Sequence, residues 1–192
     1  GREPVRIPMK QTEIPDRIDK ATGTDTPAPL LIRHAVPEDF PAILAIYARA
    51  RAFMKAHGNP RQWNDTWPPE TLLREDIRLG RMYVAVEADE IAAVFVYIQG
   101  VDIDPSYRLI ENGAWGNPGE YGVVHRLAGS GNVRGVGEYC LNWAFAQCHH
   151  LRVDTHADNL PMQRLLGKLG FTQRGIIYVR EDHDPRLAYD KF

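Results

Sequence analysis

The sequence predicts an α/β fold of the mixed α+β kind, in which one mixed sheet is covered by helices. Short apolar segments of strand length alternate with longer segments whose apolar residues recur at i, i+3 and i+4. Their order is β-α-α-β-β-β-α-β-α-β-β, which implies a mixed sheet with helices packed on it. Residues 123–147 have the pattern of a buried strand, a glycine-rich loop and an amphipathic helix, and this unit is the centre of the predicted fold.

The first half of the chain is predicted to form a strand, two helices and a hairpin. Apolar residues line one face of the first helix, and Gly58 marks its end. A tight Ala88-Asp89 turn between two strand-like segments predicts antiparallel pairing. The expected elements are a strand at 30–33, helices at 37–57 and 69–79, and strands at 82–87 and 91–98.

An irregular segment, residues 103–120, separates this hairpin from the central unit. Pro161 opens a later helix and Gly170 ends it. The expected elements of the second half are a strand at 123–128, a helix at 136–147, a strand at 151–155, a helix at 161–169, and strands at 171–179 and 186–192.

The 192 residues fit one domain with a tail. Residues 1–29 contain five prolines, several charges and few large apolar side chains, so they are expected to form a flexible N-terminal arm. The folded domain is expected over residues 30–192.

Composition excludes several classes of protein. The chain is 44% hydrophobic and 25% charged, as in ordinary globular proteins, and its formal net charge of -2 gives no reason to expect a nucleic acid or an anionic membrane as partner. No apolar run approaches the roughly 18 residues of a membrane span. The N-terminus has no apolar signal-peptide core, so a cytoplasmic location is expected.

The two cysteines, Cys140 and Cys148, fall on one predicted helix. Eight residues along a helix separate them by roughly 12 Å, which is too far for a disulfide. They are expected to be core thiols. No zinc-binding spacing is present, so no metal site is predicted.

The glycine-rich loop before the central helix predicts an anion site. A strand that feeds a glycine-rich turn into a helix leaves several backbone N–H groups pointing at one place, and the helix dipole favours a negative group there. Gly135 and Gly137 would let a diphosphate approach the backbone. Gly135-Val136-Gly137 resembles the start of a dinucleotide fingerprint, but Cys140 stands where the third glycine belongs. The alternative is a glycine-rich turn that binds nothing, because short glycine motifs often match by chance.

Three local patterns, at residues 132–137, 158–171 and 32–39, together resemble the GNAT superfamily of N-acetyltransferases. Residues 132–137, Asn-Val-Arg-Gly-Val-Gly, are similar to its pyrophosphate-binding loop, with Asn132 in place of the usual Gln or Arg. Asp158-Asn159 with Met162, followed by Gly170-Phe171, is similar to its later motif. Ile32-Arg33 and Asp39 resemble its first strand and the start of its first helix. The resemblance covers residues 30–192, and residues 62–63, Trp115 and residues 125–128 resemble a bacterial subgroup.

The resemblance implies a mostly antiparallel sheet of six to seven strands, acetyl-CoA as cosubstrate, and a possible homodimer. It also implies that the pantetheine arm lies along the edge of the fourth strand, whose neighbour splays away. The implied cosubstrate-binding residues are Leu127, Ala128 and Gly129 on that edge, the amides of Arg134, Gly135, Val136, Gly137 and Glu138 around the diphosphate, and Asn159 and Met162 beyond them. For Asn159, a helix-cap role is an equal alternative.

Acetyl transfer to an amine requires a base, a donor for the developing oxyanion, and in some cases an acid for the departing thiolate. His125 is the leading base candidate, since histidine exchanges protons near neutral pH. Period-two alternation would place it on the same face as Leu127, whose backbone N–H, or that of Ala128, would polarise the thioester carbonyl. A structural histidine is an equal alternative, and His156 is a second base candidate.

The acid is harder to assign. Many family members carry a Tyr seven residues after the motif Asn, but here that position is Leu166, which cannot donate a proton. Tyr178 and Tyr139 are possible substitutes, although packing roles with locally bonded hydroxyls are favoured for both.

Tryptophans outside the regular elements suggest walls of an acceptor pocket. Trp63 and Trp115 are the candidates, and plugs at the edge of the core are an equal alternative. Glu70, Glu75 and Asp76 would attract a cationic amine, but a solvated helix face explains them equally well.

Together these observations predict an acetyl-CoA-dependent N-acetyltransferase that acts on a primary amine of a small or amino-acid-like molecule by direct attack. Two alternatives stay open at this stage. One is a CoA-binding protein without transfer activity, which Leu166 favours, and the other is a phospholigand-binding module.

Overall fold

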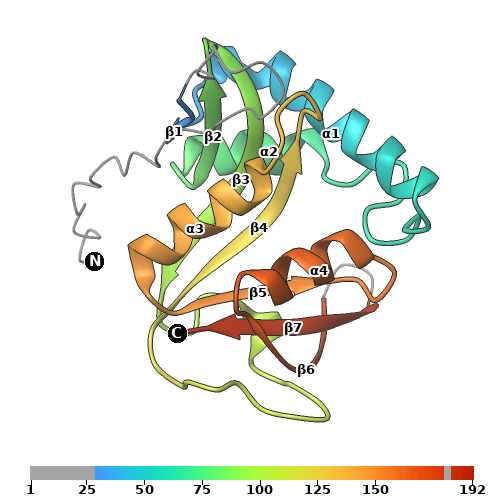
Figure 1. The fold of residues 1–192 in the computed structure, drawn as a ribbon, viewed down its shortest axis with the longest axis vertical. Coiled ribbons are helices and arrows are strands. Elements are labelled where there is room, and N and C mark those ends of the chain that lie inside the picture. Colours follow the sequence, from blue (N-terminus) through green and yellow to red (C-terminus); the bar gives the residue numbers. More distant parts are fainter. Residues whose placement is uncertain (1–28, 180–182) are drawn as a thin grey trace, which may run out of the picture.

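The computed structural model describes residues 29–179 and 183–192. Seven strands form one sheet in the order β1-β2-β3-β4-β5-β7-β6, and the only parallel pair among the described strands is β4 with β5. The predicted mixed, mostly antiparallel sheet flanked by helices is therefore confirmed (Figure 1). The predicted arm lies outside the described residues, except for its last position.

The helices and strands closely follow the expected order. The largest difference is at the first helix, where a short 3₁₀ turn, η1, precedes the α-helix because Pro37 and Pro41 occupy the entry. A second 3₁₀ turn, η2, lies inside the irregular segment. The elements are β1 Leu31–His34, η1 Pro37–Asp39, α1 Phe40–Ala56, α2 Glu70–Arg78, β2 Met82–Glu87, β3 Glu90–Gly100, η2 Pro105–Tyr107, β4 Tyr121–Gly129, α3 Val136–Cys148, β5 Leu151–Thr155, α4 Leu160–Lys168, β6 Thr172–Tyr178 and β7 Pro185–Lys191.

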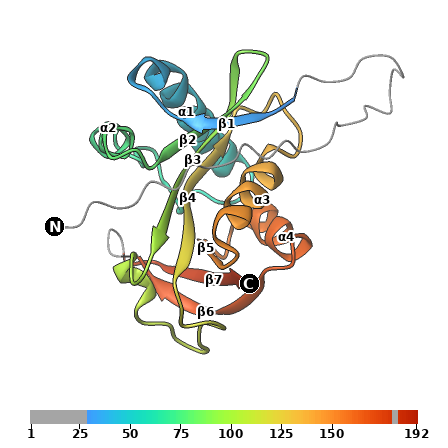
Figure 2. The same cartoon turned by 90° about the vertical axis from the view of Figure 1, so that its left-hand side faces the viewer.

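Helices cover both faces of the sheet. Figure 2 shows α1 and α2 on one side and α3 and α4 on the other. Apolar side chains of α1 and α2 pack with Val84, Val94 and Val96, whereas those of α3 and α4 pack with residues such as Phe95 and Val153 on the opposite face. This alternation along the strands buries a separate core on each of these two faces and fixes the register of the sheet.

Both cysteines lie on α3 and are free thiols, with Cys140 buried, as the sequence predicts. Among the described helices, none is both long enough and apolar enough to cross a bilayer.

The sheet opens between β4 and β5. These strands pair only at Gly122 with Leu151 and at Val123 with Arg152. Beyond these pairs β4 continues to Gly129 and β5 to Thr155 in different directions (Figure 1). The predicted splayed edge is therefore present, and the edge of β4 from Val124 onward faces a gap in the ladder instead of a neighbouring strand.

A β-bulge interrupts β4 beside this opening. His125 pairs with Val96 and Ala128 pairs with Val94, so Arg126 and Leu127 together face the single residue Phe95. Arg126 adopts a left-handed backbone with φ of 52°. The expectation that His125 and Leu127 share a face is therefore wrong, because the extra residue reverses the alternation.

Beyond the bulge, successive side chains of β4 face the opposite cores from those that an uninterrupted strand would give them. Leu127 packs against the core under α3, while Ala128 belongs to the core under α1. The strand therefore presents a backbone irregularity immediately next to His125.

Two helices hold the bulge in place. The hydroxyl of Tyr47 on α1 donates to the carbonyl oxygen of Arg126 at 2.7 Å. The Arg126 side chain donates to both carboxylate oxygens of Asp76 on α2, at 3.0 and 2.9 Å, and Arg81 adds a third bond at 2.6 Å. Asp76 is 0% exposed, so the expectation that this carboxylate lies on a solvated helix face is wrong. It is a buried anion between two arginines.

Replacing Asp76 with Ala is expected to destabilise the protein by about 3 kcal/mol, because two arginines lose the carboxylate that offsets their burial. Urea denaturation measures this change. Its neighbour Glu75 is the matched control, since it pairs with Arg78 at the exposed surface of the same helix, and Glu75→Ala should leave the denaturation midpoint unchanged. Equal midpoints for the two variants would contradict the role assigned to Asp76.

Candidate active site

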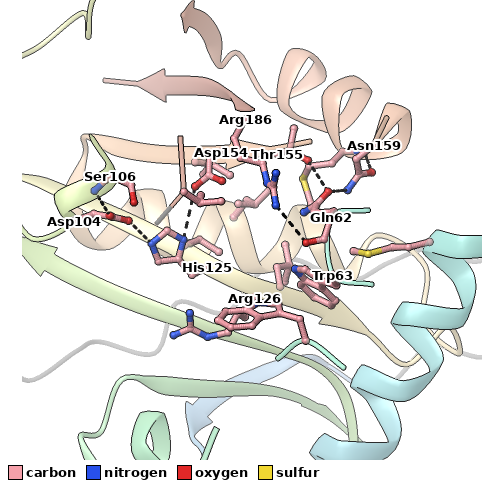
Figure 3. A pocket seen from close by; sticks show the side chains of 18 of the residues that line it. Gln62, Trp63, Asp104, Ser106, His125, Arg126, Asp154, Thr155, Asn159 and Arg186 are labelled. Atoms are coloured by element: carbon pink, nitrogen blue, oxygen red, sulfur yellow. Dashed lines mark hydrogen bonds and ion pairs between the residues drawn. The ribbon is translucent and has the colours of Figure 1, made fainter. Parts of the chain in front are cut away.

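A cavity of about 350 Å³ occupies the opening between β4 and β5. Figure 3 shows its side chains converging from several elements. Its walls come from the loop between α1 and α2, the segment around η2, the diverging parts of β4 and β5, the start of α4, and β7. Among the predicted site residues, those that line it are Trp63, His125, Leu127, Asn159 and Met162.

His125 lies between two carboxylates. Its Nε2 is 2.7 Å from Oδ2 of Asp104, and its Nδ1 is 3.9 Å from Oδ1 of Asp154 (Figure 3). The backbone N–H of Ser106 also donates to Asp104, at 2.9 Å, and the hydroxyl of Tyr107 donates to Asp154, at 2.6 Å. Both carboxylates are thus oriented by further hydrogen bonds.

The two carboxylates differ in their titration. Burial works to raise the pKa of Asp104, but the hydrogen bond and positive charge of His125 outweigh it and hold that pKa below its ordinary value. Burial raises the pKa of Asp154 above its ordinary value, although His125 and Tyr107 oppose the change. Burial, together with the charge of Asp154, raises the pKa of Tyr107 well above its usual range. Asp104 is therefore the more firmly ionised partner of His125.

This arrangement selects a tautomer of His125. An ionised carboxylate only accepts hydrogen bonds, so the Nε2 that faces Asp104 carries the proton. The lone pair of the neutral ring is then on Nδ1. The 3.9 Å between Nδ1 and Asp154 is too long for a hydrogen bond. His125 can therefore take up a proton at Nδ1, and both carboxylates would stabilise the resulting cation.

The glycine-rich loop ends where α3 begins. Gly135 has a left-handed backbone, with φ of 67°, and the N–H of Tyr139 donates to its carbonyl oxygen, which closes the first turn of the helix. The N–H groups of Val136, Gly137 and Glu138 come before this first bond, so they have no carbonyl acceptor within the helix. Arg134 is exposed at this end.

The start of α3 adjoins both β4 and α4. A Cβ added at Gly129 would meet Val136 at 3.2 Å, and one at Gly137 would meet Leu165 of α4 at 3.3 Å. Glu138 also pairs with Lys168 of α4 at 2.9 Å. The helix start and the cavity therefore adjoin the same two elements, β4 and α4, although Ala128, Gly129 and residues 134–138 do not line the cavity itself.

Asn159 caps α4. Its Oδ1 accepts from the N–H of Met162 at 3.2 Å, and its Nδ2 donates to the side chain of Gln62 at 3.0 Å. The cap role is present, and Asn159 also lines the cavity, so the two predicted readings are compatible.

The two candidate tryptophans lie in different places. Trp63 is 7% exposed, packs edge-on against Tyr47 and lines the cavity. Trp115 lies outside the cavity lining. Its Nε1 donates to the carbonyl oxygen of Tyr107 at 2.8 Å, and Arg152 stacks over its ring, as in the core-plug alternative.

The other side chains considered from sequence have local partners. Leu166 is 0% exposed within the core. Tyr139 donates to the carbonyl of Leu30 at 2.6 Å, and Tyr178 donates to Glu111 at 2.9 Å. The Nδ1 of His156 accepts from the N–H of Asp158 at 3.0 Å, and this histidine does not line the cavity.

Sequence reasoning missed Asp104, Asp154 and the reach of Gln62. Asp154 left one signal, a carboxylate inside a predicted strand of the sheet, which is expensive to bury unless it is paired. Asp104 lies in an irregular segment, where no periodicity of apolar residues predicts the course of the backbone. Among the residues that the structure describes, no group of three or more metal-ligating side chains could hold a metal ion.

Comparison with known proteins identifies the family of the chain. Residues 29–172 match the model of the acetyltransferase (GNAT) domain. No protein with a curated function matches the chain by sequence.

Solved structures share the fold. A GNAT-family acetyltransferase from Streptococcus agalactiae is 30% identical, with a TM-score of 0.76 over 85% of this chain and 95% of its own. An acetyltransferase structure from Staphylococcus aureus is 27% identical, with a TM-score of 0.58 over 83% and 97% of the two chains. One from Listeria monocytogenes, at 17% identity, has a TM-score of 0.65 over 94% and 99%.

Three findings point to the same family. They are the opened edge of β4, the glycine-bearing start of α3 and the family model that matches residues 29–172. The chain belongs to the GNAT family of acetyltransferases, which are acyltransferases that use acetyl-CoA as cosubstrate.

Proposed function

We propose that the protein transfers an acetyl group from acetyl-CoA to the primary amine of a small or amino-acid-like acceptor. The observation that carries this proposal is the position of His125, between Asp104 and Asp154, in a cavity at the opened edge of β4. A base that is reachable from a free strand edge is what direct attack by an amine on a bound thioester requires.

The residues present fit acetyl-CoA. The free edge of β4 offers backbone groups to the amides of a pantetheine arm, in the manner of strand addition. The amides at the start of α3, from Arg134 to Glu138, suit a diphosphate, and Gly135 and Gly137 leave the approach open. Asn159 and Met162 would contact the arm at the far side of the opening.

His125 would remove a proton from the acceptor. The ammonium group of the amine loses a proton to Nδ1, and the freed nitrogen lone pair attacks the thioester carbonyl carbon. Asp104 holds Nε2, so it keeps the ring in the required tautomer and stabilises the imidazolium. Asp154, on the other side of the ring, adds negative charge that favours the same cation.

The bulge in β4 would supply the oxyanion donor. Attack converts the carbonyl oxygen to an oxyanion, and a backbone N–H at Leu127 or Ala128 lies one or two residues beyond the strained Arg126. The tetrahedral intermediate then breaks its carbon–sulfur bond, and the nitrogen gives its second proton to the departing CoA thiolate or to solvent, which leaves a neutral amide. The CoA thiolate departs without an assigned acid, since Leu166 is buried and cannot donate a proton.

The acceptor would enter between Trp63 and the acidic pair around His125. Asp104 and Asp154 favour an arriving ammonium group, and the indole of Trp63 offers an apolar surface beside it. A cytoplasmic location and a homodimer stay predictions from the sequence.

A thiol-release assay tests the proposal. The protein is incubated with acetyl-CoA and with amino acids, arylalkylamines, polyamines and aminoglycosides in turn, and free CoA is measured. Turnover with one class identifies the acceptor. Calorimetric binding of acetyl-CoA without turnover on any amine would favour the non-catalytic alternative that Leu166 suggests, and absence of binding would favour a phospholigand module.

Replacing His125 with Gln is expected to lower the transfer rate by about 100-fold, since general-base catalysis contributes about 10²–10⁴. The fall in rate toward acid pH should also flatten, because the titrating base is gone. Steady-state kinetics over a pH series measure both effects. His34→Gln, on exposed β1, is the control and should keep the wild-type profile. A wild-type profile in the His125 variant would remove it as the base.

Replacing Gly135 with Ala is expected to weaken acetyl-CoA binding roughly tenfold, because a Cβ strains the left-handed backbone by about 1–2 kcal/mol and the loop should relax away from the geometry that presents its amides to the diphosphate. Gly137→Val should have a similar effect through the crowded contact with Leu165. Calorimetry gives the affinities. Gly167→Ala on α4 is the matched control, since a Cβ there meets nothing within 4 Å. Unchanged affinity at Gly135 and Gly137 would reject their contact with the diphosphate.

A further inference from the structure

Gln62 reaches across the cavity from the loop between α1 and α2, residues 57–69, to the turn after β5 (Figure 3). Its Oε1 lies 3.0 Å from Nδ2 of Asn159, 3.3 Å from the backbone N of His156 and 3.5 Å from Oγ1 of Thr155. Asn59, in the same loop, donates to the same oxygen at 3.1 Å. One side-chain oxygen thus joins two segments that are more than 90 residues apart in sequence.

The chemistry of the donors fixes which atom of Gln62 makes these contacts. A backbone N–H can only donate, so the atom that faces His156 must be an acceptor, which is the amide oxygen. The backbone of Gln62 is tied to the same side of the cavity, because Arg186 of β7 donates to its carbonyl oxygen at 3.3 Å. Both the side chain and the main chain of Gln62 therefore bridge the opening.

The bridge connects the two substrate sides of the cavity. On one side, Gln62 precedes Trp63, the buried indole proposed as the acceptor wall. On the other side, it holds the amide of Asn159, whose Oδ1 caps α4 through Met162. Asn159 and Met162 are the residues proposed to contact the pantetheine arm.

We propose that Gln62 is a positioning residue that couples the two substrate sites. A pantetheine arm seated against Asn159 and Met162 orders residues 57–69 through the Gln62 bridge, and this ordering sets Trp63 for the acceptor. The coupling is reciprocal, so an acceptor held by Trp63 would also tighten binding of acetyl-CoA. This inference rests on the proposed use of acetyl-CoA at this site.

Hydrogen–deuterium exchange tests the coupling with acetyl-CoA as the probe. In the wild type, saturating acetyl-CoA should slow exchange both at residues 134–138 and at residues 57–69. Q62M removes the acceptor at similar length, so residues 57–69 should exchange about tenfold faster without ligand, and acetyl-CoA should no longer protect them. Q62E keeps acceptor oxygens at the same reach and should behave as the wild type does.

Gln163 supplies the matched control. Its Nε2 donates to the carbonyl oxygens of Ala157 and His156 at 2.7 and 3.4 Å, so it holds the same turn without touching the loop. Q163M should loosen the turn and leave exchange at residues 57–69 unchanged. A loop that responds equally to both variants would indicate general loosening and overturn the specific role of Gln62.

The failure of this inference differs from failure of the proposed function. If acetyl-CoA protects residues 134–138 in the wild type but leaves residues 57–69 unchanged, the coupling is wrong and cosubstrate binding stands. Equal protection of residues 57–69 in Q62M and in the wild type also overturns it. If the wild type shows no protection at residues 134–138 and no binding heat, the proposed function fails, and the coupling fails with it.

Discussion

The pairing of β4 with β5 at only two residue pairs is the constraint on which the site depends. A parallel ladder that continued to Gly129 would satisfy the backbone of β4 and close the space that the cavity occupies. Because the strands diverge instead, β4 exposes both its edge and one side of His125. The opened region is stabilised elsewhere, by helices on each face and by the antiparallel pairs β3–β4 and β5–β7 on the two sides.

The bulge in β4 makes a second contribution. It is held by one hydroxyl and one buried carboxylate from two different helices, so the core that stabilises α1 and α2 also sets the backbone beside His125. Burying Asp76 is tolerable because two arginines satisfy it, and a positive φ at Arg126 is tolerable because Tyr47 bonds its carbonyl. Stability and site geometry are therefore supported by the same few contacts.

Much of the fold could be predicted from sequence, and parts of the site could not. Apolar periodicity locates the elements because each buries one face, and glycines and prolines mark their ends. His125 and Asn159 stand in recognisable patterns. The face of Leu127 could not be predicted, because a bulge changes the alternation and is fixed by contacts from Tyr47 and Asp76, which lie more than 45 residues away in sequence.

The contacts of Asp104 and Gln62 could not be predicted from the sequence for a related reason. Both belong to irregular segments whose paths are determined by tertiary contacts, and their partners lie on distant strands and turns. Trp63 and Trp115 illustrate the limit well. Both are tryptophans outside regular elements, yet one lines the cavity and the other packs under Arg152, and nothing in their local sequence distinguishes the two environments.

One wall of the cavity comes from a loop and the rest of the site comes from the sheet and its helices. This division has a consequence for how such proteins diverge in sequence. The cavity wall beside Trp63 is built by a connection between helices, whereas the backbone groups along β4 and at the start of α3 belong to the framework. Substitutions at the exposed positions of that connection, such as Asn64 in the cavity wall, leave the framework's ladders and cores intact. Proteins with this architecture can therefore acquire selectivity for a new acceptor through sequence changes in the short connection between α1 and α2, while they keep the same reaction.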